Sequence, residues 1–200
     1  MTCITNAISQ RYITHLQKQG IQIADTDYIN DWDSMDSHTK SGLAKTITLQ
    51  LHEMSKRVDI GTPVFRLLNL VSKNCSKHAM CFVLTSCEDN NYILEIFDSN
   101  GIMKDNGKDP LDTFVLNLMD IVAFKYSSEY KCKLTTVQTR GGGNNLNTIR
   151  QGNCDVLLLY YIALRSKYTM FDTNALLDSS PMNLKRIKGI NEAIVKKKLF

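Results

Sequence analysis

Apolar side chains in the first third of the chain recur with the spacing of a helix. In Thr39–Arg57 the apolar positions follow one another at intervals of four, four and three residues, which predicts one helix there. Ala7–Lys18 shows a mixed pattern of the same kind. The acidic stretch Asp25–His38 is predicted to be a loop or a short helix. Pro63 suits the first turn of a further helix, whose apolar stripe consists of Val64, Leu67, Leu68 and Val71.

The middle of the chain changes to the pattern of strands. His78–Ser86 and Tyr92–Phe97 are short runs rich in residues that favour strands, and the polar segment Cys87–Asn91 separates them. This arrangement predicts a β-hairpin. Because neither run alternates cleanly between apolar and polar residues, we expect a sheet that is buried on both faces.

The second half of the chain mixes both kinds of element. Asn153 can cap an apolar helix that runs from Cys154 to about Arg165. Three consecutive glycines make Thr139–Asn147 a flexible loop, since glycine loses the most backbone freedom on ordering. The other predicted elements are a helix over Pro110–Phe124, a strand over Lys131–Gln138 and a helical tail from Met182 onward.

This order of elements predicts an α+β fold in which helices pack on a small central sheet. We expect one domain over residues 1–200, because no repeat or long linker divides the chain. Within it, residues 1–75 form a helical N-terminal part, residues 76–166 the core with the sheet, and residues 167–200 a helical C-terminal tail. A chain of this length can bury a sizeable core without disulfides or metals.

Composition indicates an ordinary globular protein in which 43% of the residues are hydrophobic and 22% are charged. The longest apolar run, Val156–Leu164, is far too short for a membrane span of about 20 residues, so no membrane partner is expected. Met1–Gln10 lacks the basic and apolar segments of a secretory signal, which favours an intracellular location, in host cytoplasm or in a virion.

Cysteine spacing argues against a metal site. The six cysteines form no CxxC pair, so neither zinc nor another cofactor is expected, and the thiols of an intracellular chain stay reduced. The glycines Gly141–Gly143 lack the Lys-Ser/Thr pair of a phosphate-binding loop, which excludes nucleotide binding on that motif.

The net charge of +4 is too small to indicate nucleic-acid binding by the whole chain. Basic residues do gather near the C-terminus. A solvated helix face explains them best, and a site for nucleic acid or an acidic partner is the weaker alternative. The residues concerned are Lys185, Arg186, Lys188, Lys196, Lys197 and Lys198.

Cys154 is the strongest candidate for chemistry. It opens a helix that is apolar nearly all round, and the positive end of a helix dipole stabilises a thiolate. A nucleophile also needs a base and a group that orients the base. His78 begins the first strand of the predicted hairpin and Asp98 ends the second, so the two are expected to lie side by side although twenty residues separate them.

With these residues in place, the chain resembles the Ulp1-type and adenovirus-type cysteine proteases, which have a papain-like architecture. The likeness rests on His78, on Asp98 in FDSNG, and on Gln151 with Cys154 in QGNCD, and it covers roughly residues 77–165. The short gap between Gln151 and Cys154 is closer to the virion proteases of large DNA viruses. The resemblance implies that Gln151 helps to form an oxyanion hole, with Gln138 as a second candidate.

Two positions depart from the family pattern. Ala79 stands where the family often has tryptophan after the histidine, and Asp155 stands where glycine often follows the cysteine. An acidic side chain beside the nucleophile opposes thiolate formation when it points into the site. These departures motivate a hypothesis of a different class, in which the chain keeps the protease fold without catalysis as a structural or interaction protein, such as a minor virion component.

The first hypothesis is a cysteine endopeptidase. The resemblance implies cleavage after small residues, often in a Gly-X segment, of a viral structural precursor or a ubiquitin-like protein. Its partners are then a protein substrate and virion proteins. A deubiquitinase-like or acyltransferase activity on the same residues is a third alternative, which sequence does not separate from proteolysis.

Overall fold

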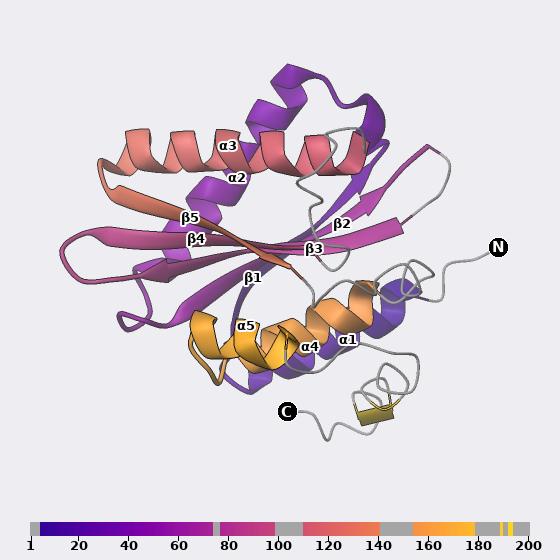
Figure 1. The fold of residues 1–200 in the computed structure, drawn as a ribbon. Coiled ribbons are helices and arrows are strands. Elements are labelled where there is room, and N and C mark those ends of the chain that lie inside the picture. The colour runs from indigo at the N-terminus through magenta and orange to yellow at the C-terminus, as the bar shows by residue number, and fades with distance from the viewer. Residues whose placement is uncertain are drawn as a thin grey trace.

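Five strands form one mixed sheet in the computed structural model, which describes residues 5–73, 77–98, 110–140 and 154–178 together with 189, 192 and 193. Strand order in the sheet follows chain order (Figure 1). The strands are β1 Gln22–Asn30, β2 Pro63–Val71, β3 Lys77–Ser86, β4 Asn91–Asp98 and β5 Lys133–Arg140. The helices are α1 Thr5–Lys18, α2 Ser37–Ser55, α3 Pro110–Tyr130, α4 Cys154–Arg165 and α5 Met170–Asp178, with a 3-10 turn η1 at Trp32–Ser34.

Strand directions bring four strand ends to one edge of the molecule. β3 is antiparallel to β2 and β4, while β1 runs parallel to β2 and β5 runs parallel to β4. The strands β1, β2, β4 and β5 therefore all end where β3 begins, at Lys77 and His78. We call this the His78 end of the sheet.

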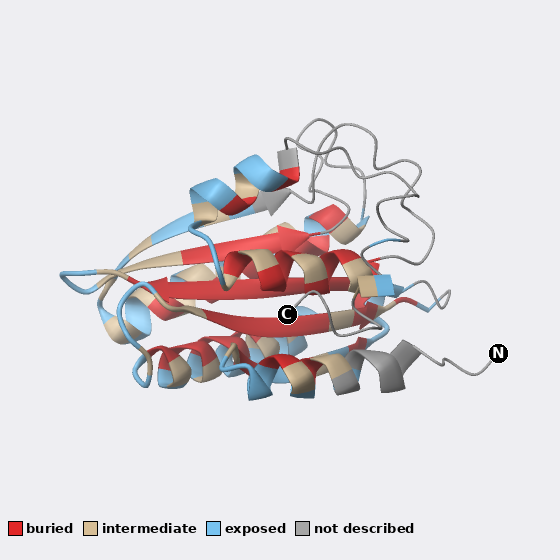
Figure 2. Cartoon of the chain, turned by 90° about the horizontal axis from the view of Figure 1, so that it is seen from below, coloured by how far each residue is buried: buried red, intermediate tan, exposed pale blue. Residues whose placement is uncertain are grey.

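Helices cover the sheet on both faces and make a three-layer structure (Figure 1). α2 and α3 pack on one face, around a core that includes Ile47, Phe82 and Leu118. α1, α4 and α5 lie on the other face, around a core that includes Leu16, Phe65 and Ile162. The central strands are accordingly buried along most of their length (Figure 2). The α+β class, with a small sheet packed by helices and buried on both faces, is as predicted.

The helix predicted from Pro63 onward is wrong, because this segment forms strand β2. Val64 and Leu68 face the core under α2, whereas Phe65 and Leu67 face the core under α4. A short apolar run that is buried on both faces has no clear period, so it fits a helix and a strand equally well. Proline is tolerated as the first residue of a strand, which is the position that Pro63 occupies.

The loop predicted over Asp25–His38 is also wrong for its first part, which belongs to the edge strand β1. Its aspartates disfavour strands, and the pairing with β2 is irregular between Ile23 and Thr26. One of them has a specific partner, since Asp27 Oδ2 lies 2.6 Å from Nη2 of Arg66, a side chain that is fully buried on β2. The short helix allowed for this segment is present as η1.

The N-terminal part, residues 1–75, is not wholly helical as predicted, because it contributes β1 and β2 to the sheet. The remaining predicted elements are confirmed where the structure describes them. These are the N-terminal helix α1, the long helix α2, the hairpin of β3 and β4, strand β5, and helices α3 and α4, of which α3 runs six residues further than expected. Strand β5 takes in the first two residues of the predicted glycine loop, and α5 was missed. The rest of that loop, Asn153 and most of the C-terminal tail lie outside the described residues. None of the helices among the described residues is long and apolar enough to cross a bilayer.

A buried histidine joins α2 to α3. His52 Nδ1 lies 3.1 Å from the Tyr126 hydroxyl, and its ring stacks on Tyr130 with a centroid distance of 3.3 Å. Burial disfavours the imidazolium and lowers the pKa of His52, and the charge of Lys56 lowers it further. At a pH near the ordinary pKa of histidine, His52 in the folded protein is therefore mostly neutral.

We expect the contribution of His52 to the free energy of unfolding to fall as the pH drops below about 6.5. In that range the unfolded chain takes up a proton at His52 that the folded chain binds less readily, so acid favours unfolding. In urea titrations between pH 7.5 and 5, the unfolding free energy of the wild type should fall relative to that of His52→Gln as the pH is lowered. His38→Gln, which changes an exposed histidine, is the control and should keep the wild-type slope.

Candidate active site

The hairpin brings His78 and Asp98 together at the His78 end of the sheet. Asp98 is paired with Met80, so His78, two residues earlier on β3, is its diagonal neighbour on the same face. Nε2 of His78 lies 2.9 Å from Oδ1 of Asp98, and both side chains are buried, with 5% and 1% of their surfaces exposed. The adjacency predicted from the two strand ends is thus what the structure shows.

Cys154 approaches His78 from the helical layer under the sheet. It is the first residue of α4, and it belongs to the buried core on this face, which also contains Ala79 and Phe97. Its side chain is hydrogen-bonded to His78. Three of the four predicted site residues therefore meet, with the imidazole between a carboxylate and a thiol.

The surroundings of His78 favour its protonated form. Burial by itself disfavours the imidazolium, but hydrogen bonds to Asp98 and Cys154 and the negative charges of these groups outweigh burial and raise the pKa of His78 to about 10. The ring is therefore an imidazolium at neutral pH. A cationic imidazole beside a thiol stabilises the thiolate, which is the nucleophilic form of cysteine.

The two candidates for the oxyanion hole have different positions. Gln151 lies outside the described residues, as does the glycine loop. Gln138 is exposed on β5, two residues before Arg140, whose backbone is opposite Asp98 in the β4–β5 register.

Both residues that depart from the family pattern lie in the described part of the chain. Ala79 is buried in the core under α4, and Asp155 is half-buried in the first turn of α4.

A buried ion pair fastens the far end of α4 to β4. Oε1 of Glu95 accepts hydrogen bonds from Nε and Nη2 of Arg165, at 2.9 and 2.7 Å. Oε2 of Glu95 accepts one from the Tyr161 hydroxyl at 2.8 Å. Arg165 also donates to Thr85 Oγ1 and to the Tyr168 carbonyl. Glu95 is completely buried, so its charge depends on these partners.

An aromatic stack adds a second contact between the same two elements. The rings of Phe97 and Tyr161 are almost parallel, at 7°, with centroids 3.9 Å apart. Phe97 immediately precedes Asp98, and Tyr161 lies on the helix that begins with Cys154. The ion pair and the stack therefore connect the strand that carries the carboxylate to the helix that carries the thiol.

Sequence reasoning missed this network, although a signal was available. Glu95 stands alone in the apolar strand YILEIF, and Arg165 ends an apolar helix. Charged side chains are almost never fully buried without a partner, so single charges of opposite sign in two buried elements predict an ion pair between them.

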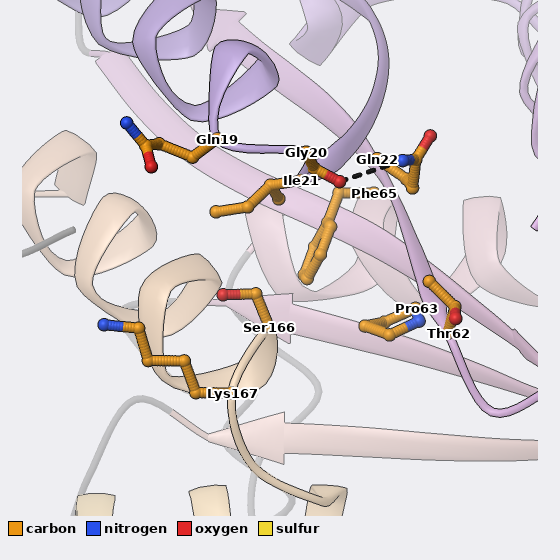
Figure 3. A pocket seen from close by; sticks show the side chains of 9 residues that line it. All are labelled: Gln19, Gly20, Ile21, Gln22, Thr62, Pro63, Phe65, Ser166 and Lys167. Atoms are coloured by element: carbon orange, nitrogen blue, oxygen red, sulfur yellow. Dashed lines mark hydrogen bonds between the residues drawn. The ribbon is translucent and has the colours of Figure 1, made fainter.

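A separate pocket lies at the opposite end of the sheet from His78. It holds about 250 Å³ between the ends of α1 and α4 and the start of β2 (Figure 3). Phe65, Ile21 and Pro63 give it an apolar wall, and Lys167 lies at its rim. In the described part of the chain, no three His, Cys, Asp or Glu side chains gather where they could hold a metal ion.

Comparison with known proteins gives distant structural likenesses only. No family model matches the chain, and no curated protein matches its sequence. Among solved structures, the pS273R protease of ASFV is similar with a TM-score of 0.47 and 12% identity over 98% of this chain and 66% of its own. The effector protein RavZ of Legionella pneumophila has a TM-score of 0.45 and 10% identity over 90% of this chain.

A de-sumoylating protease is a further similar structure, with a TM-score of 0.37 and 12% identity over 96% of this chain and 72% of its own. The chain spans about half of RavZ, 48%, and somewhat less than two thirds of the ASFV protease. Likenesses at these levels assign no family to the chain, so its chemistry has to be argued from His78, Asp98 and Cys154 themselves.

We expect Asp98→Asn to lower the pKa of His78. The substitution keeps the size of the side chain but removes the negative charge that favours the imidazolium. NMR titration of ¹⁵N-labelled histidine should show that His78 is still protonated at pH 8 in the wild type. In the variant, His78 should lose its proton at a lower pH than in the wild type. An unchanged titration would mean that Asp98 does not control the charge of His78.

We expect Glu95→Gln to cost about 3–5 kcal/mol of unfolding free energy, because it leaves the buried Arg165 without its counter-charge. The double variant E95L/R165M should lose much less, since well-packed apolar residues can replace a buried ion pair. Urea denaturation measures both values. Equal losses in the two variants would show that packing, rather than charge, holds α4 on β4.

Proposed function

We propose that this chain is a thiol-dependent peptidase with Cys154 as nucleophile, His78 as acid and base, and Asp98 as the group that orients His78. The observation that carries the proposal is the position of His78, which lies 2.9 Å from Asp98 and is hydrogen-bonded to Cys154. A nucleophile, its base and an orienting carboxylate in contact are the minimum for covalent acyl transfer.

The reaction follows from the charges of these groups. The Cys154 thiolate adds to the carbonyl carbon of the scissile peptide bond, and the negative charge passes to the carbonyl oxygen. The intermediate collapses as the His78 imidazolium donates a proton to the departing amine, which leaves a thioester on Cys154. Neutral His78 then takes a proton from water, and the resulting hydroxide releases the carboxylic acid and regenerates the thiolate.

The start of α4 supplies part of the stabilisation that the oxyanion needs. The first N–H groups of a helix have no partner within the helix and carry its positive dipole end, so Cys154 lies where a negative charge is favoured. We assign the remaining donor to the side chain of Gln151, as the family resemblance implies, with Gln138 as the alternative.

The substrate class rests on the resemblance of the site residues to the Ulp1-type and adenovirus-type enzymes. It implies cleavage after small residues, in a Gly-X segment of a viral structural precursor or a ubiquitin-like protein, inside a host cell or virion. A second function is a structural or interaction protein that keeps the fold without catalysis. The low exposure of Cys154, 9%, favours this second function, because a nucleophile has to be reached by its substrate.

Labelling and cleavage measured on the same protein separate the two functions. With a peptide ending in Gly-Gly coupled to 7-amido-4-methylcoumarin, we expect Cys154→Ala to lower kcat/KM by at least about a thousandfold. Cys87→Ala, which removes a half-buried thiol at the β3–β4 turn, is the matched control and should retain activity. Iodoacetamide at pH 7 should alkylate Cys154 faster than Cys87 or Cys132.

Cleavage that survives Cys154→Ala would remove Cys154 from the mechanism. Absence of cleavage together with slow alkylation of Cys154 would favour the structural function. Fast alkylation with transfer of the acyl group to an added amine, in place of hydrolysis, would instead indicate an acyltransferase on the same residues.

A further inference from the structure

We propose that a groove between β1 and the N-terminal half of α2 binds a basic, extended segment of a polypeptide. The groove has a volume of about 540 Å³, within the range of ligand-binding clefts. Its walls come from the last residues of β1, the residue Met35 that follows η1, and the first turns of α2. It is separate from the pocket of Figure 3, which lies at the other end of the sheet.

The lining of the groove suits an apolar side chain. Tyr28, Met35 and Leu43 are among its lining residues, and Tyr28 is 45% exposed, although a large aromatic gains by burial. Gly42 leaves the helix side of the groove open, because a Cβ atom built there meets nothing within 4 Å. An apolar side chain of a partner can therefore enter between strand and helix.

The charge around the groove selects a basic occupant. Five aspartates lie in residues 25–36, and no lysine or arginine occurs from residue 19 to residue 39. Only Asp27 has its charge offset by a buried arginine, Arg66. The amino group of Lys40, the next cation along the chain, lies 5.5 Å from the centre of the Phe114 ring. Asp33 accepts a hydrogen bond from the backbone N–H of Lys73, while Asp31 and Asp36 adjoin the lining residues Asn30 and Met35 in the chain. In a chain of net charge +4, this acidic segment complements lysine and arginine.

The backbone of β1 suits an extended chain. β1 is an edge strand that pairs with β2 on one side within the described sheet. The N–H and C=O groups on the outer side of an edge strand can pair with an added strand. An extended segment on β1 would place every second side chain on the face of the groove.

The groove and the proposed active site share one end of the sheet. Ile29, which lines the groove, is paired with Leu70, and Leu70 is paired with His78. Two strand spacings amount to about 10 Å, a distance that three or four extended residues span. If the proposed function holds, the basic segment belongs to the substrate and lies a few residues from the scissile bond; binding itself does not depend on that function.

Fluorescence anisotropy on Cys154→Ala protein tests binding without catalysis. The probe is fluorescein-labelled Gly-Lys-Arg-Phe-Arg-Lys-Gly, and the comparison peptide has glutamate in place of each basic residue. We expect D31N/D33N to weaken binding about three- to tenfold. The matched control is D59N/D89N, which removes two exposed carboxylates at the other end of the sheet. Each pair includes one aspartate whose backbone is in the left-handed conformation, Asp31 or Asp89. Asparagine tolerates this conformation, so neither substitution should strain the backbone.

Gly42→Leu tests the groove itself. Leucine fills the open space and favours the helix, so the variant should fold while binding falls at least tenfold. Any of three results would overturn the proposal. The acidic peptide could bind as tightly as the basic one, D59N/D89N could weaken binding as much as D31N/D33N does, or Gly42→Leu could bind the peptide as tightly as the wild type. A dimer in sedimentation that Gly42→Leu dissociates would also overturn it, because the groove would then hold a second copy of the chain.

Discussion

The buried ion pair between Glu95 and Arg165 is the constraint on which the position of the candidate nucleophile depends. α4 is about 16 Å long, with Cys154 at one end and Arg165 at the other. A tilt of about 5° around the ion pair would move Cys154 by about 1.4 Å. Because misplacement by about 1 Å can cost a hundredfold in rate, the network of Glu95, Tyr161 and Arg165 sets the geometry of a site that it does not touch.

The candidate site combines contributions from two of the three layers of the molecule, the sheet and the helical layer that contains α4. The sheet supplies His78 and Asp98 as neighbours on one hairpin, and the helical layer supplies Cys154 at the start of α4. Neither layer holds the three groups alone, so the site exists only when the helix is seated on the sheet. The raised pKa of His78 is a consequence of this assembly, since both groups that favour its imidazolium come from other elements.

Local sequence patterns correctly predicted the elements whose structure depends mainly on residues close together in the chain. The hairpin, α2, α4 and the adjacency of His78 and Asp98 follow from apolar spacing and from a polar turn. β2 has no period that separates strand from helix, and β1 is held in the sheet partly by Asp27, whose partner Arg66 lies 39 residues away. Local periodicity does not say which distant residues pair, so the partner of Asp27 could not be read from it. The ion pair of Glu95 differs, because the single charges at Glu95 and Arg165 in two apolar elements were a signal that went unused.

The hairpin turn has a consequence for how the protein can be handled. Asp89 and Asn90 both adopt left-handed conformations, as a tight two-residue turn requires. This turn lies a full strand length, about 25 Å, from the His78 end, where four of the five strands finish. A fluorophore or surface anchor attached there would leave the thiol, the imidazole and the acidic groove unobstructed, so the molecule offers a natural point of attachment for single-molecule work.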